Sequence, residues 1–196
     1  DHGHAEGHGH QQGHHHHERH LGEILGIIEA ADIAPRAKER ASSIFRVLAD
    51  AEAAIHGISP DKVHFHEVGA VDAIVDIVGA AIGLEILGIE QVYASAVPTG
   101  TGMVRCAHGL LPVPAPATLE LLRRANAPLR GPQADGEMVT PTGAAILCAL
   151  AQFAQPKMKV SRIGYGFGTK EFPWPNALRL WVGEPAAPSN GGPILG

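Results

Sequence analysis

The sequence predicts an α+β fold: a two-layer domain with a mixed sheet, an N-terminal helical hairpin and a long apolar helix. Three observations predict it. Helical patterns come first along the chain and mixed elements follow, regular βαβ alternation is missing, and hydrophobic residues make up 45% of the 196. Because only 5% are aromatic, we expect aliphatic side chains to fill one core of moderate size.

The N-terminal half predicts a helical hairpin and then a short extended piece. Apolar residues recur at helical spacing in 21–31. Pro35 suits the first turn of a second helix, which continues to His56 and is closed by Gly57. An extended segment over 62–65 follows.

A long apolar helix is expected from Gly69 to Leu87, stopped by Gly88. Its expected buried face consists of Val71, Val75, Val78 and Ile82. The surrounding apolar run contains three acidic residues, and each would cost about 3 kcal/mol in a membrane. The sequence therefore indicates a buried helix and no membrane span.

The second half mixes short elements, and no internal repeat is visible. Expected are strands at 91–97 and 103–107 around a turn at 98–102, helices at 116–124 and 140–152, and strands at 157–164 and 178–182. The segment 111–117 holds too many prolines for a central strand. Residues 185–196 are typical of a linker, and a chain that begins at Asp1 is expected to be a piece of a longer protein.

The net charge argues against two classes of partner, and the cysteine content argues against two kinds of structural site. The formal charge is −5, which gives no long-range attraction to nucleic acid or to an anionic membrane. Cys106 and Cys148 form no CxxC motif, so neither a zinc ribbon nor a disulfide framework is indicated. We therefore expect a cytoplasmic protein.

Nine of the 13 histidines lie in the first 20 residues. An expression tag, a solubilising stretch and a native metal-binding arm are all compatible with this composition. Because the histidines alternate with glycine and acidic residues and continue into the first helix, we favour a flexible native arm over 1–20. Its four-residue run is the expected site for nickel, copper or zinc: His14, His15, His16 and His17.

A second cluster lies where the extended segment meets the long helix. On a strand, His64 and His66 would project from one face about 7 Å apart. On the helix that follows Glu67, Asp72 and Asp76 form an i, i+4 pair. Imidazoles with carboxylates suit a metal ion or acid–base catalysis. The alternative is that the acids solvate an exposed helix face and the histidines are ordinary polar residues.

Three further segments permit chemistry. The helix start at Thr140, Thr142 and Gly143 could hold a phosphate, although capping explains Thr140 equally well. The glycine-rich turn at 98–102 is a weaker phosphate candidate. Cys106 and His108 would share one face of a strand as a soft-metal or acid–base pair, with burial of the cysteine as the competing interpretation.

Several motifs in order resemble the LarC family of nickel insertion proteins. They are the histidine run 14–17 and the segments AEAAIHG (51–57), VHFHEVGAVD (63–72), CAHGLLPVPAPAT (106–118), VTPTGAA (139–145) and IGYGFG (163–168). The resemblance extends from the arm to about Glu184.

The resemblance implies an enzyme that inserts Ni²⁺ into pyridinium-3,5-bisthiocarboxylic acid mononucleotide and so completes the nickel-pincer cofactor of lactate racemase. It implies CTP cleavage to CMP and pyrophosphate with Mg²⁺ or Mn²⁺, on a C-terminal domain missing from this sequence. The expected organisation is an arm (1–20), an α+β nickel-insertion domain (21–184) and a linker (185–196). Lactate racemase is a candidate partner, and we expect a homo-oligomer.

Combining this family with the residues gives a hypothesis for the site. His64, His66 and Glu67 present nickel, Asp72 or Asp76 completes the site or orients a histidine, and the helix start at 140–143 receives a phosphate. His108 is a further candidate ligand. A non-catalytic nickel store or metallochaperone and a metal-dependent phosphoester hydrolase remain as alternatives.

Overall fold

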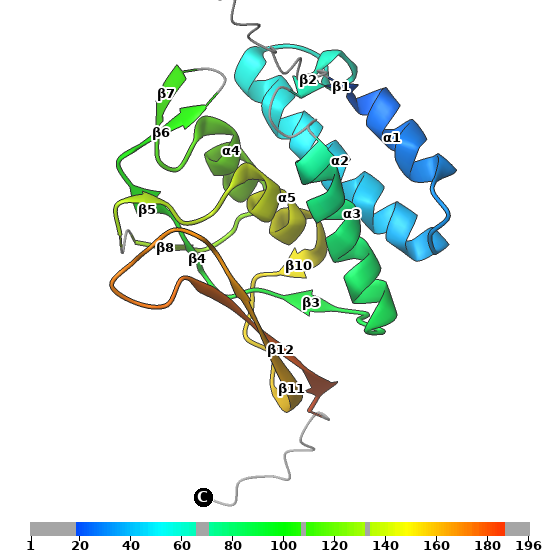
Figure 1. The fold of residues 1–196 in the computed structure, drawn as a ribbon, viewed down its shortest axis with the longest axis vertical. Helices are drawn as coiled ribbons and strands as arrows, with labels where there is room; N and C mark the ends of the chain where they lie inside the picture. Colours follow the sequence, from blue (N-terminus) through cyan, green and yellow to red (C-terminus); the bar gives the residue numbers. More distant parts are fainter. Residues whose placement is uncertain (1–18, 66–70, 107–108, 132–133, 187–196) are drawn as a thin grey trace, which may run out of the picture.

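The computed structural model describes residues 19–65, 71–106, 109–131 and 134–186 (Figure 1). Helices and short strands both occur in these residues, so the mixed α/β character predicted from the sequence is confirmed. The α-helices are α1 (Leu21–Ala30), α2 (Pro35–His56), α3 (Val71–Ile86), α4 (Pro116–Arg124) and α5 (Pro141–Leu150). Within the described residues, no helix is long and apolar enough to cross a membrane.

Helix α2 lies at the centre of the helical layer and packs against the other four helices (Figure 1). Its buried residues recur every three or four positions, which gives one stripe along the helix, and they include Ile44, Phe45 and Leu48. Pro35 occupies the first turn, as expected. Gly57 closes the helix at φ 64°, a left-handed conformation that glycine adopts without a Cβ penalty.

Helix α3 turns a different face inward from the one the sequence pattern predicted. Its buried stripe is Ala73, Ile77 and Ala81, while the expected core residues Val71 and Val75 are 59% and 62% exposed. The prediction was wrong because the apolar residues of α3 lie on more than one face of the helix, so periodicity alone does not select the buried face. The small alanine side chains allow a close approach to other helices.

A polar contact ties the end of α3 to α2. The guanidinium of Arg40 donates to the backbone carbonyl of Ile89, and its Nη1 lies 3.5 Å from the Glu85 carboxylate. Arg40 is largely buried and Glu85 partly so, which shields this ion pair from full solvent screening. Glu85, one of the three acidic residues inside the apolar run, therefore has a structural partner in Arg40.

In the part of the chain that the structure describes, the strands pair two by two and do not form the single mixed sheet that was expected. The pairs are β1 (Arg19–His20) with β2 (His64–Phe65), β3 (Val92–Tyr93) with β10 (Ala151–Gln152), β4 (Val97–Pro98) with β8 (Leu129–Arg130), β5 (Gly100–Thr101) with β9 (Gly136–Glu137), β6 (Met103–Cys106) with β7 (Gly109–Pro112), and β11 (Met158–Phe167) with β12 (Ala177–Pro185). The pairs β3–β10 and β4–β8 are parallel, and the others are antiparallel.

The hairpin formed by β11 and β12 extends away from the helical layer (Figure 1). Its strands pair over nearly their whole length, yet their apolar side chains stay open to solvent. Phe167 is 74% exposed and Leu178 is 64% exposed. Among the described elements, no other helix or strand packs extensively against this hairpin.

Candidate functional site

The structure brings together two histidines that are 44 positions apart in the sequence. His20 and His64 are direct partners across the antiparallel pair β1–β2, and their ring centroids lie 3.8 Å apart. His64 is exposed and His20 is half-buried. Two imidazoles in contact at the surface are a pair of nitrogen donors suited to nickel, copper or zinc.

Local structure fixes both histidines. His20 directly precedes α1, and the carboxylate of Glu23 accepts a hydrogen bond from the His20 backbone N–H at 2.9 Å. Next to His64, the buried ring of Phe65 packs edge-on against Phe45 of α2, with centroids 6.2 Å apart. Because side chains alternate along a strand, anchoring Phe65 in the core directs His64 outward.

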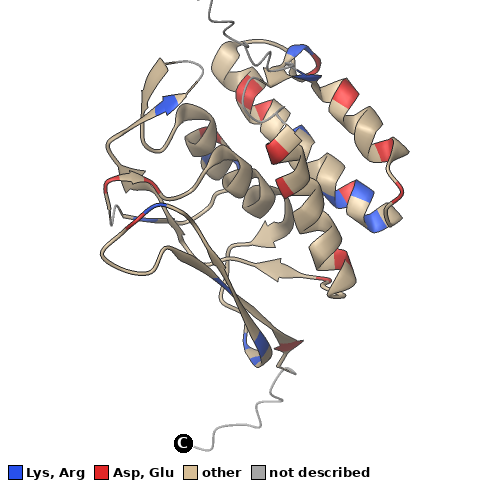
Figure 2. Cartoon of the chain, viewed as in Figure 1, with Lys and Arg blue, Asp and Glu red and all other residues tan. Residues whose placement is uncertain are grey.

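The two aspartates expected near His64 lie on α3 and are exposed. Acidic positions follow this helix in Figure 2. Among the described residues, however, no three histidine, cysteine or acidic side chains gather closely enough to hold a metal ion. The segment that joins the two aspartates to His64 lies outside the described residues. The role of Asp72 and Asp76 at a metal site therefore stays a prediction.

Several other predicted site residues, unlike Asp72 and Asp76, lie outside the described residues. They are His14, His15, His16 and His17 of the arm, His66 and Glu67 after β2, and His108 between β6 and β7. Cys106, the expected partner of His108, is a free thiol at the end of β6 and is half-buried. Their roles stay predictions.

The start of α5 has the geometry of a capped helix. The Thr140 hydroxyl oxygen accepts a hydrogen bond from the backbone N–H of Gly143 at 3.1 Å, and Pro141 occupies the first helical position. This bond satisfies one N–H that a bound phosphate would otherwise use. Capping therefore accounts for Thr140 and for the N–H of Gly143, and a phosphate that contacts Thr142 stays a prediction.

The glycine-rich turn at 98–102 is explained by close packing. Gly100 and Gly102 have φ values of 80° and 84°, and a Cβ on Gly100 would lie 2.0 Å from the backbone oxygen of Gly136. A Cβ on Gly102 would meet the carboxylate of Asp135 at 2.2 Å. The adjacent backbone thus requires Gly100, and the positive φ favours glycine at 102, whether or not a ligand binds.

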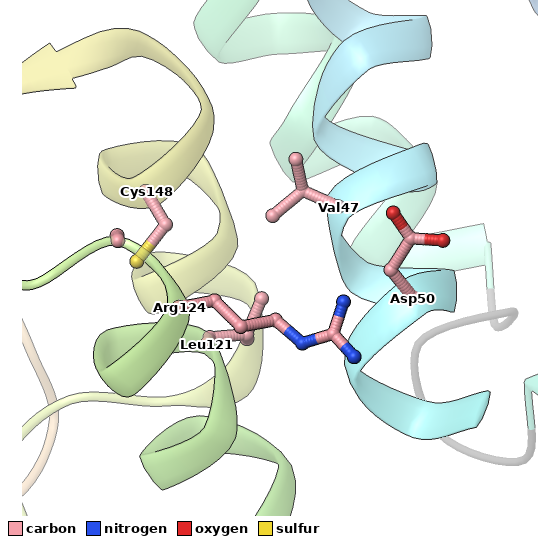
Figure 3. A pocket seen from close by; sticks show the side chains of 6 residues that line it. Val47, Asp50, Leu121, Arg124 and Cys148 are labelled. Carbon is pink, nitrogen blue, oxygen red and sulfur yellow. The ribbon is translucent and has the colours of Figure 1, made fainter. Parts of the chain in front are cut away.

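A hollow of about 240 Å³ lies between α2, α4 and α5 (Figure 3). Its lining residues are Val47, Asp50, Leu121, Arg124, Ala125 and Cys148. Figure 3 shows Arg124 extending from α4 toward the side of α2 that carries Asp50.

Two groups at this hollow are held in unreactive forms. Burial raises the pKa of the Cys148 thiol to about 11, so it stays protonated at neutral pH and is a poor nucleophile or metal ligand. Arg124 is bound to Glu120 at 2.7 Å, and hydrogen bonds from Arg123 and Arg124 lower the pKa of Glu120 to about 2. The hollow therefore offers packing space with little chemistry.

Sequence reasoning placed His20 in the arm and missed its pairing with His64. The available signals were short: His20 stands directly before a helix, and His64 alternates with the apolar Val63 and Phe65. These signals indicate the two local conformations. They do not indicate which strand pairs with which, because strand register across 44 positions depends on how the helices pack.

The family model and the curated relatives that match this chain carry the same description, nickel insertion protein. A sequence profile described as "Nickel insertion protein" matches residues 4–192. A relative in Desulfitobacterium hafniense, named pyridinium-3,5-bisthiocarboxylic acid mononucleotide nickel insertion protein, is 54% identical over 175 residues, which are 88% of this chain and 43% of the relative. No solved structure gives a significant match.

Two further relatives carry the name "Putative nickel insertion protein". The one in Thermomicrobium roseum is 54% identical over 166 residues, which are 85% of this chain and 41% of the relative. The one in Citrifermentans bemidjiense is 56% identical over 169 residues, which are 85% of this chain and 43% of the relative. The chain thus spans about two fifths of the length of the curated relatives it matches.

Proposed function

Because this chain belongs to the nickel insertion protein family, we propose that it forms part of an enzyme that inserts Ni²⁺ into pyridinium-3,5-bisthiocarboxylic acid mononucleotide. The observation that carries the proposal is the family match, which extends over both the histidine-rich arm and the cluster at 64–76. Further support is the relative named for this substrate. The complete reaction is proposed for a protein of the relatives' length.

The finer features of the reaction follow from the resemblance to the LarC family. We propose that insertion depends on CTP with Mg²⁺ or Mn²⁺, and that the product serves lactate racemase. The CTP site is assigned to polypeptide outside these 196 residues. The chain alone is then expected to bind nickel without completing insertion.

The proposed chemistry needs nickel ligands, a base and a site for one phosphate. Forming a nickel–carbon bond at the pyridinium ring replaces a C–H bond, so a ring proton must move to a base. His64, His66 and Glu67 present the nickel ion in this proposal. Asp72 or Asp76 completes the site or orients a histidine, since both are exposed carboxylates on one helix face.

The remaining roles are assigned by residue type. Thr142 binds the substrate phosphate through its hydroxyl and its backbone N–H, supported by the positive end of the helix dipole. The arm over 1–20 collects nickel, 21–184 forms the insertion domain, and 185–196 connects it to a further domain. His108 serves as an additional ligand. We place the protein in the cytoplasm as a homo-oligomer.

The test is a reconstitution with purified components. A protein of the relatives' length is incubated with the pyridinium mononucleotide, Ni²⁺, CTP and Mg²⁺, and the nickel-containing product is measured by mass spectrometry. We expect product only with all components, and none from the 196-residue chain alone. Absence of product under every condition, with several weakly bound nickel ions, would instead indicate a nickel store. Turnover of simple phosphoesters without nickel insertion would indicate a hydrolase.

A further inference from the structure

His20 belongs to the folded domain as well as to the end of the arm. It is the second residue of β1, and its strand partner is His64, the first residue of the cluster proposed to present nickel. The pairing therefore joins the last histidine of the arm directly to the insertion domain. Nothing in the sequence pattern or in the family comparison assigns a role to this contact.

The two imidazole rings are in contact, with their centroids 3.8 Å apart and their planes tilted by 52°. Two imidazoles that bind one ion each place a ring nitrogen about 2.1 Å from it, so the two rings must move apart from this contact when the ion binds. The His20 side chain also faces the backbone N–H of Glu23 as part of the capping box of α1, and nickel binding would replace that interaction. His64 is exposed, so an ion can reach its ring from solvent.

The backbone positions of the pair are held from both sides. Glu23 accepts from the His20 backbone N–H, and the buried ring of Phe65 fixes the strand that carries His64. A site built on such anchored strands loses less conformational freedom on binding than a flexible arm does. The pair is therefore better organised for a single ion than the glycine-rich segment before it.

We propose that His20 and His64 together bind one Ni²⁺ ion and receive it from the arm for transfer into the insertion site. This inference rests on the proposed nickel function. Two imidazoles occupy only part of the coordination shell, and water fills the other positions. Such a site can exchange its water ligands for those of the next site, which suits an ion that must be released.

The test measures nickel binding to the full chain after the metal-binding side chains of the arm have been removed by substitution. The eight histidines of residues 1–18 are replaced by serine, so chain length is kept and the arm no longer competes. Ni²⁺ binding is measured by calorimetry and equilibrium dialysis for this background and for His20→Ala, His64→Ala and the double variant. His56→Ala is the matched control, because His56 lies on α2 beside Glu52 and not on the paired strands β1 and β2.

We expect one ion per chain in the background and in the His56→Ala control. Removing a residue that only supports a metal ligand typically weakens metal binding about 10-fold to 100-fold. His20→Ala and His64→Ala each remove a proposed ligand, so each should weaken Ni²⁺ binding by at least this much. Because both residues would hold the same ion, the double variant should lose little more than either single variant. Unchanged affinity in His20→Ala would overturn the proposal, as would additive losses that indicate two separate ions.

A second measurement separates lost ligands from lost structure. Circular dichroism of His20→Gln should match the background, while Ni²⁺ no longer slows amide hydrogen exchange at 19–20 and 64–65. If Ni²⁺ protects these residues equally in His20→Gln, His20 is no ligand and the proposal fails. Because no pyridinium substrate is present, failure here leaves the insertion assay unaffected, and failure of that assay leaves this result standing.

Discussion

Phe45 and Phe167 are the same residue type in opposite surroundings, and they represent two regions of the molecule. Phe45 lies on α2 at 0% exposure, whereas Phe167 lies on β11 at 74% exposure. The helical layer supplies most of the buried core, although some of its apolar side chains, such as Val71 and Val75 of α3, are exposed. The β11–β12 hairpin satisfies its backbone by strand pairing but leaves its apolar side chains in solvent, a marginal arrangement for two strands alone. Stability therefore comes from the helices.

The largest expected effect tests this difference directly. Phe45→Ala removes a fully buried ring that also supports Phe65, so it should lower the free energy of unfolding by about 3 to 5 kcal/mol. Phe167→Ala should change it by less than about 0.5 kcal/mol. Urea denaturation of both variants gives the comparison. Equal losses would show that the hairpin contributes to the folded core.

An intermediate effect is expected at the start of α5. Thr140→Ala removes the hydroxyl that accepts from the Gly143 N–H and should cost about 1 kcal/mol of unfolding free energy. Thr140→Ser keeps that acceptor and is the matched control. Urea denaturation should therefore rank serine close to threonine. A serine variant as unstable as the alanine variant would argue against the cap.

At neutral pH the smallest expected effect is that of Cys148, whose contribution appears only as a pH dependence in the alkaline range. Burial raises its pKa to about 11, so the folded state retains the thiol proton at pH values where the unfolded chain has lost it. Stability should consequently fall as pH rises from the ordinary thiol pKa toward 11, and Cys148→Ala should remove that part of the dependence. Thermal unfolding at alkaline pH is the measurement. An identical pH dependence in Cys148→Ala would contradict the assignment.

The sequence predicted much of the helical layer because its signals are local. Pro35 and Gly57 mark the ends of α2, and Thr140 with Pro141 marks the start of α5. Such residues act through their own backbone geometry or through hydrogen bonds within one turn. The predicted end of α5 was two residues too late, since the chain becomes extended at Ala151.

Strand pairing and the buried face of α3 could not be predicted, because both depend on distant contacts. The expected strand at 91–97 is divided into β3 and β4, which pair with different partners. On α3 the pattern fits several faces, and contact with α2 selects the one with Ala73 and Ile77.

The candidate site shows the same division. Its residue types were visible in the sequence, and Thr140 acts locally as a cap. The contact between His20 and His64 was invisible, because it requires two strands far apart in the chain to meet in register.

The central claim is that nickel is presented from the strand that carries His64. It is tested most directly by nickel insertion in a protein of the relatives' length that carries His64→Ala and His66→Ala together, at saturating Ni²⁺ and CTP. Asp61→Asn, an exposed change in the same region, serves as the control. We expect loss of the nickel-containing product in the double variant and normal yield in the control. Normal yield from the double variant would contradict it.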